Sequence, residues 1–134
     1  MDVFVGRLMS SPVRTVTRTT PIQEAATLML DNGIGSVVVV DNVGHLDGIL
    51  TATDFVTLAA DGQPAEETEV HEYMSTDVIT ATANDLITDV AETMLDRGFH
   101  HVPVVDETEG VVGIITTTDF TAYLSETNLD NDVQ

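Results

Sequence analysis

Two threonine–aspartate pairs with the same spacing are the residues of this sequence best placed to do chemistry. Thr51 is followed by Asp54, and Thr116 is followed by Asp119. An ionised carboxylate accepts hydroxyl hydrogen bonds and has no donor of its own, which suits the vicinal diol of a sugar. Each pair falls where a predicted strand ends and a predicted helix begins, so free N–H groups and the positive helix end favour an anion there. The structural alternative is that the aspartates only cap helices and the threonines are ordinary strand-end residues.

These pairs belong to a long internal repeat with an offset of 65 residues, the separation of Met9 and Met74. The register continues without a gap from Val5 to Phe55, which is too long for chance matching. Two copies of one unit are therefore predicted. The matched segments are Met9-Ser10 with Met74-Ser75, Leu30-Asp31 with Leu95-Asp96, Gly33 with Gly98, Asp41 with Asp106, Gly48-Ile49 with Gly113-Ile114, and Thr53-Asp54-Phe55 with Thr118-Asp119-Phe120.

The elements that must position the pairs follow the same order in both copies. In the first copy, Thr20 is a good N-cap, Pro21 suits the first helical position, and Gln23 completes a capping box. Gly33 and Gly98 are predicted to end the first helix of each copy. The other expected elements are strands at 13–16, 36–40 and 46–51 and a helix capped by Thr53 or Asp54 and ending near Ala60, then a helix capped by Asp85, strands at 102–105 and 111–116, and a helix at 119–124.

The composition predicts a folded and strongly acidic protein. Apolar residues make up 43% of the chain, and the formal net charge is −19, with 23 acidic residues and only four basic ones. This charge repels nucleic acid and anionic membranes, and high salt would screen the self-repulsion. We therefore expect a salt-adapted cytoplasmic protein. There is no cysteine, no long apolar segment and no signal-peptide pattern.

The segments at 48–54 (GILTATD) and 113–119 (GIITTTD) resemble the closing motif of cystathionine-β-synthase (CBS) domains. Together with the two Met-Ser openings and the Val-Val-Asp turns, they identify the chain as similar to stand-alone tandem CBS pairs, from a salt-adapted source of the haloarchaeal type. The resemblance implies an α+β fold of two βαββα units packed sheet to sheet about a pseudo-twofold axis, and a homodimer. The implied domains are 1–60 and 70–125, with a linker at 61–69 and a flexible acidic tail at 126–134.

The resemblance also implies a ligand site in the cleft between the two units. In such pairs the threonine contacts phosphate and the aspartate holds ribose hydroxyls. His100 and His101 distinguish the second copy, and we hypothesise that imidazole makes its cleft better for phosphate. A metal site there is disfavoured because adjacent strand residues point to opposite faces. The implied ligand-binding residues are Thr51, Asp54, Thr116 and Asp119, together with the adenine-lining positions Thr15, Val16, Ile34, Gly35, Ser36, Thr80, Ala81, Phe99, His100 and His101.

The expected function is regulatory rather than catalytic. No nucleophile elbow, phosphate-binding lysine loop or metalloprotease helix is present in the sequence. The resemblance implies sensing of AMP, ADP, ATP or S-adenosylmethionine, with Mg²⁺ left open, and signalling to a separate effector protein, with no nucleic acid and no membrane as partners. The alternative is a dimerisation scaffold that binds no nucleotide. Two intact Thr-x-x-Asp pairs favour the sensor.

Overall fold

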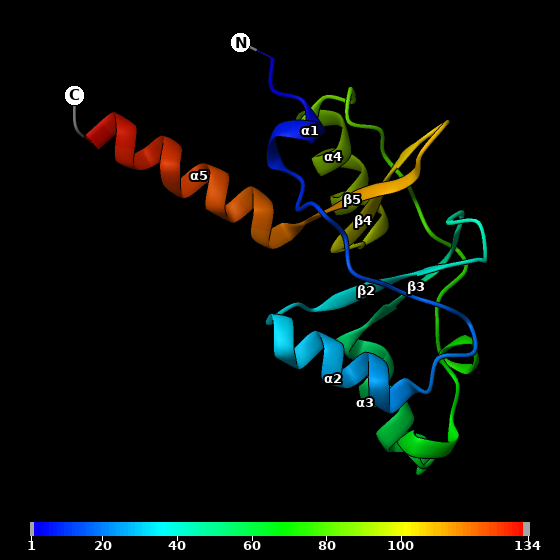
Figure 1. The fold of residues 1–134 in the computed structure, drawn as a ribbon. Coiled ribbons are helices and arrows are strands. Elements are labelled where there is room, and N and C mark those ends of the chain that lie inside the picture. The colour runs from blue at the N-terminus through cyan, green and yellow to red at the C-terminus, as the bar shows by residue number, and fades with distance from the viewer. Residues whose placement is uncertain (1, 133–134) are drawn as a thin grey trace. The chain divides into compact units, whose positions relative to one another are not determined.

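The computed structural model describes residues 2–132, and it describes side-chain burial as far as residue 126. The chain divides into two compact units (Figure 1). The central unit is Val13–Val78, and the terminal unit joins Met1–Pro12 to Ile79–Gln134. Each unit is described here by itself.

The central unit is built on a three-stranded sheet of order β1-β2-β3, formed by β1 (Thr15–Val16), β2 (Ser36–Val40) and β3 (Leu46–Thr51). Strand β1 is parallel to β2, and β2 is antiparallel to β3. Figure 1 shows α2 (Ile22–Asn32) and α3 (Ala52–Asp61) together on one side of this sheet. Two short 3₁₀ turns, η1 (Ala65–Glu67) and η2 (Val70–Glu72), follow. Because β2 carries β-branched residues on both faces, Val37, Val38 and Val39 are all buried.

The terminal unit has the antiparallel pair β4 (His101–Asp106) and β5 (Gly110–Thr116). Its helices are α1 (Val5–Leu8), α4 (Ile87–Arg97) and α5 (Thr117–Asp132). A parallel bridge between Ala81 and Val104 takes the place that β1 has in the other unit. The expected acidic tail from 126 is helical as far as Asp132, and the remainder of that segment lies outside the described residues.

The repeat predicted from the sequence is visible in the strand register. The register of β2 on β3 shifts between Val39 and Val40, and that of β4 on β5 shifts between Val104 and Val105. The two shifts lie at equivalent positions of the repeat, so both hairpins bend at the same place. The structure is a mixed α+β fold with two small sheets, which confirms the predicted fold class.

The predicted helix ends are correct at the C-terminus and wrong at the N-terminus. Gly33 and Gly98 end α2 and α4 in the left-handed conformation, as expected. Thr20 and Asp85, however, do not cap these helices, which begin at Ile22 and Ile87 without a side-chain cap.

A backbone carbonyl supplies the missing caps. The Ile22 N–H donates to Thr68 O at 2.8 Å, and the Ile87 N–H donates to Val3 O at 3.0 Å. The side chain of Thr20 instead accepts the Thr17 N–H in the preceding turn. The Asp85 carboxylate likewise accepts the Thr82 N–H.

The opening Met-Ser segments show how the compact units differ from the sequence copies. Met9 and Ser10 lie against β5 in the terminal unit, where Ser10 forms an antiparallel bridge with Ile114. The equivalent Ser75 bridges Ile49 of β3 in the central unit. The opening of each copy therefore packs on the closing strand of the other copy. Among the described residues, no helix is long and apolar enough to cross a membrane.

Candidate functional site

The corner between β3 and α3 holds the first threonine–aspartate pair. Thr51 is the N-cap of α3, and Asp54 is at the third helical position, so the two residues form a capping box. Asp54 Oδ2 accepts the Thr51 backbone N–H at 2.8 Å and the Thr51 hydroxyl at 3.5 Å. The sequence prediction that Thr53 or Asp54 is the N-cap is thus wrong by a few residues, because the strand-end threonine takes that position.

The Asp54 carboxyl has a raised pKa and one oxygen that the capping box does not use. Burial raises the pKa of the Asp54 carboxyl, and the hydrogen bonds from Thr51 oppose that shift only in part. The carboxylate is half-buried and uses only Oδ2 in the capping box. Further hydroxyl donors on Oδ1 would stabilise its ionised form.

The corner between β5 and α5 holds the second pair with nearly the same geometry. Asp119 Oδ2 accepts the Thr116 N–H at 2.9 Å and the Thr116 hydroxyl at 3.2 Å. The Asp119 N–H in turn donates to the Thr116 hydroxyl oxygen at 3.4 Å. A third donor is present here, since the Ser10 hydroxyl donates to Asp119 Oδ1 at 3.1 Å. The structural alternative, that the aspartates cap helices, therefore holds for the Oδ2 atom of each aspartate, because that oxygen stabilises the start of the helix.

The segments that follow α2 and α4 are joined directly to these corners. The Ala52 N–H donates to Gly35 O, and the Thr117 N–H donates to His100 O, both at 3.1 Å. In the sheets, Ser36 pairs with Thr51. His101 pairs with Thr116 in the same way. The structure thus brings each corner together with the predicted lining residues that follow α2 and α4. Thr15 instead pairs with Val38 of β2, and Ala81 bridges Val104 of β4.

The predicted lining residues divide by exposure. Val16 and Ala81 are buried in the hydrophobic cores of their units, and Ser36 is buried as well. Their side chains therefore support the site, and only a change of packing would bring them to a ligand. The residues accessible to a ligand are Thr15, Ile34, Gly35, Thr80 and His100, with Phe99 partly exposed.

The two histidines differ in environment. His100 is exposed, whereas His101 is partly buried, and its Nδ1 atom has no hydrogen-bond partner among the residues that the structure describes. Burial lowers the pKa of His101, and the neighbouring His100 lowers it further, while Asp119 opposes the shift. The neutral imidazole is thus favoured at His101. This argues against a cationic His101 that attracts phosphate, but a neutral ring can still donate one N–H hydrogen bond to a phosphate oxygen. No group of three metal-ligating side chains gathers among the described residues.

Positive charge near the corners is scarce. Arg97 lies over the ring of Phe99, with 5.6 Å between the guanidinium carbon and the ring centroid. Arg7 lies over Tyr123 in the same way. Arg18 pairs with Asp47 at 3.4 Å. Arg14, next to Thr15 in the sequence, makes no side-chain contact of these kinds within the described part of the chain. An anionic ligand therefore has few cations to meet.

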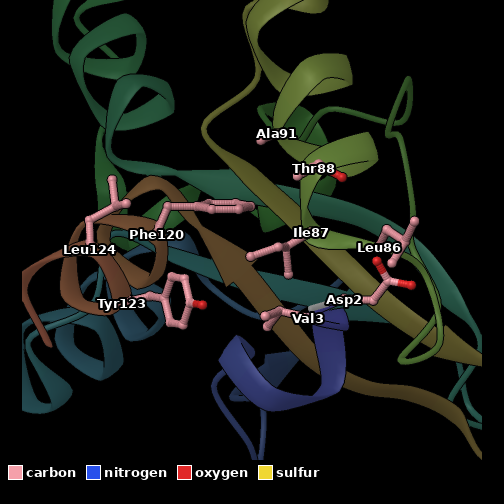
Figure 2. A pocket seen from close by; sticks show the side chains of 9 residues that line it. All are labelled: Asp2, Val3, Leu86, Ile87, Thr88, Ala91, Phe120, Tyr123 and Leu124. Carbon is pink, nitrogen blue, oxygen red and sulfur yellow. The ribbon is translucent and has the colours of Figure 1, made fainter. Parts of the chain in front are cut away.

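Two apolar cavities of about 430 Å³ each lie between α4 and α5. In the first, Phe120 and Tyr123 of α5 face Val3 and Ile87 (Figure 2). The second is lined in part by Phe99 and His100, the only predicted site residues among the linings of these two cavities. Sequence reasoning did not select these cavities, because their apolar residues are indistinguishable from core residues in the pattern of the helices.

Ser10 is the corner residue that the site prediction missed. The repeat identified it as part of the Met9-Ser10 opening, but its position in the sequence is far from Asp119. Only the packing of that opening on β5 brings its hydroxyl to the carboxylate.

The comparisons with known proteins agree with the repeat and with the fold. The CBS domain family matches residues 5–61 and 70–126. A crystal structure of the CBS domain pair of protein MJ0100, in complex with 5′-methylthioadenosine and S-adenosyl-L-methionine, superimposes with a TM-score of 0.85 at 30% identity. The match covers 95% of this chain and 99% of that one. This chain belongs to the CBS domain family and carries two CBS repeats.

Curated relatives include proteins longer than this chain. An uncharacterized 17.7 kDa protein of Acidianus ambivalens is 31% identical over 92% of this chain and 74% of its own length. The uncharacterized protein MJ1225 of Methanocaldococcus jannaschii is 34% identical over 97% of this chain. This chain spans only 46% of MJ1225, about half its length.

Proposed function

We propose that this chain is a non-enzymatic regulatory module that binds an adenosyl compound and passes the binding event to a separate effector protein. The candidate ligands are AMP, ADP, ATP, S-adenosylmethionine and 5′-methylthioadenosine. The adenosyl compounds bound to the CBS pair of MJ0100 support this class of ligand. The nucleoside would contact the accessible edge residues, such as Thr15 and Ile34 in the central unit, and the Thr-x-x-Asp corner.

The proposal rests on the different hydrogen bonding of the two oxygens of the Asp54 carboxylate. Its Oδ2 atom is held by Thr51, whereas its Oδ1 atom has no hydrogen-bond partner among the described residues. Burial has already raised the carboxyl pKa, so the carboxylate is incompletely solvated. A ribose diol supplies hydroxyl donors that can bond the Oδ1 atom in place of solvent.

The charge of the protein favours neutral or cationic adenosyl compounds over polyphosphates. The net charge is −19, and three of the four arginines are engaged by Tyr123, Phe99 and Asp47. The sulfonium ligand S-adenosylmethionine is attracted by this field, whereas ATP is repelled. We therefore expect affinity for S-adenosylmethionine to fall with added salt and affinity for ATP to rise.

Calorimetric titration of the whole chain tests the proposal through Asp54→Asn. The asparagine oxygen can still accept the Thr51 N–H, but the amide replaces the acceptor that the ribose needs. A hydrogen bond to a charged group contributes about 1.5–3 kcal/mol, so affinity for 5′-methylthioadenosine at this corner should fall roughly 10- to 100-fold. Affinity should also fall as pH falls through the raised pKa of Asp54, because binding requires the ionised carboxylate.

The matched control is Asp31→Asn, which removes the same charge from an exposed position of α2. It should leave the affinity nearly unchanged. The 2′-deoxy analogue of the nucleoside should bind wild type more weakly but should bind the Asp54→Asn variant no worse than the ribose compound does. If no adenosyl compound binds wild type, the module is a scaffold and the proposal fails.

We also propose that the chain forms a homodimer. The supporting observation is a pair of repeat-equivalent leucines at the ends of α2 and α4, since Leu30 is 82% exposed and Leu95 is 84% exposed. Leu95 also lines the second apolar cavity beside Leu124, which is itself 58% exposed. Apolar side chains gathered at a cavity are typical of surfaces that associate.

A further inference from the structure

The hydroxyl of Ser10 occupies the carboxylate oxygen that the central unit leaves open. It donates to Asp119 Oδ1 at 3.1 Å, while Asp119 Oδ2 already accepts the Thr116 N–H and hydroxyl. Both oxygens of Asp119 are therefore engaged before any ligand arrives.

The backbone that presents Ser10 is held firmly on β5. The Ser10 N–H donates to Ile114 O at 2.8 Å, and the Ile114 N–H donates to Ser10 O at 3.1 Å. A Cβ at Gly113 would lie 2.9 Å from Ser10 O and 2.8 Å from Met9 Sδ, so the segment approaches the strand as closely as a glycine permits. Only the Ser10 side chain is free to turn, and it is exposed to solvent.

The equivalent position in the central unit has the same backbone but a different side-chain contact. The Ser75 N–H donates to Ile49 O at 2.9 Å, and the Ile49 N–H donates to Ser75 O at 3.0 Å. The Ser75 hydroxyl makes no hydrogen bond within the described part of the chain, and Asp54 Oδ1 remains unpaired. The two corners therefore have the same backbone hydrogen bonds and differ in the side-chain hydrogen bond from Ser10 to Asp119.

We propose that Ser10 is a specificity-determining residue that makes the two corners unequal, so that a ribose diol binds the Asp54 corner more tightly and must displace the Ser10 hydroxyl to bind the Asp119 corner. This inference rests on the proposed function, because it assumes that the aspartates receive ribose hydroxyls.

The cost of displacement is modest, because the exposed Ser10 hydroxyl can rotate toward water without moving the backbone. The ligand exchanges one hydrogen bond to a carboxylate for another, and the Ser10 hydroxyl recovers a bond to solvent. A net hydrogen bond of ordinary strength predicts that Ser10 weakens ribose binding at the Asp119 corner by about three- to tenfold. Ser10 thus separates the concentration ranges over which the two corners respond, without closing either one.

Calorimetry with 5′-methylthioadenosine tests this inference, since that probe carries the ribose diol and no phosphate. In an Asp54→Asn background the remaining binding reports the Asp119 corner. There, Ser10→Ala should tighten binding about three- to tenfold, and Ser10→Thr, which keeps the hydroxyl, should leave it weak. The matched control Ser75→Ala should have no effect. In an Asp119→Asn background, Ser10→Ala should likewise have no effect.

The outcomes separate the two proposals. If wild type binds the probe but Ser10→Ala leaves both affinities unchanged, or if Ser75→Ala acts equally, Ser10 does not determine the difference and the inference is overturned while the proposed function stands. If wild type and every variant fail to bind the probe, S-adenosylmethionine and AMP, both the proposed function and this inference fall. Urea unfolding of each variant identifies any that do not fold, and a folded Ser10→Thr that behaves as wild type confirms that the hydroxyl itself acts.

Discussion

Replacement of Val5 by alanine would test whether the N-terminal segment belongs to the terminal unit. Val5 is fully buried and lies in a core cluster with residues such as Ala81, Ile87 and Ile115. Its N–H donates to Asp85 O at 2.9 Å, so the backbone is fixed beside the start of α4.

The magnitude follows from the atoms removed. Val5→Ala deletes two buried methyl groups, worth about 0.8 kcal/mol each in transfer free energy. The cavity left behind adds roughly 1 kcal/mol, because a fixed backbone allows little collapse. The free energy of unfolding should therefore fall by about 2–3 kcal/mol, which urea denaturation followed by circular dichroism can measure.

The location of the effect distinguishes the compact units from the sequence copies. Two-dimensional ¹H–¹⁵N NMR of Val5→Ala should show the largest amide shifts within 79–126. The matched control Val37→Ala removes the same two methyl groups from the core of the central unit, where Val37 is 1% exposed, and should shift amides within 13–78. If Val5→Ala instead perturbed mainly 13–78, the packing of the N-terminal segment described here would be refuted.

Three further predictions follow from particular contacts. Gly113→Ala and Gly48→Ala should each destabilise the chain by about 1–3 kcal/mol, because a Cβ would meet Ser10 O at 2.9 Å or Ser75 O at 2.7 Å; unchanged urea midpoints would contradict this close packing. Burial lowers the pKa of His101 from its ordinary value of 6.5, so the neutral side chain contributes its full stability above pH 6.5, and this contribution is lost as pH falls through the lowered pKa. The free energy of unfolding of His101→Gln should therefore decrease less than that of wild type between about pH 7 and 5. Equal decreases would contradict this prediction. Leu95→Glu should shift sedimentation toward the monomer, whereas the exposed turn variant Val43→Glu should not, and a monomeric wild type would disprove the homodimer.

Much of the fold could be predicted because local chemistry repeats in the sequence. The 65-residue offset predicted two copies, and the strands expected at 36–40 and 46–51 coincide with β2 and β3. Gly33 and Gly98 ended their helices as expected, since only a residue that tolerates positive φ suits that position. The positions of the threonine–aspartate corners were also predictable, because each lies where a predicted strand ends, although the N-cap of α3 was placed two or three residues too far along the chain.

The failed N-caps have a common cause. Thr20 and Asp85 are suitable capping residues, but the first N–H groups of α2 and α4 donate instead to the backbone carbonyls of Thr68 and Val3, which lie far away in the sequence.

The amino-acid sequence by itself determined the family, the two copies and the pair of hydroxyl-and-carboxylate corners, because each depends on residues that lie close together along the chain. Only the tertiary structure decided that the opening segment of one copy packs on the closing strand of the other. It also decided that Ser10 meets Asp119 whereas Ser75 leaves Asp54 open. These contacts join residues that are 26 apart in the sequence (Ile49 and Ser75) or 109 apart (Ser10 and Asp119), and the hydroxyl contact also depends on side-chain rotation, so no local pattern encodes them.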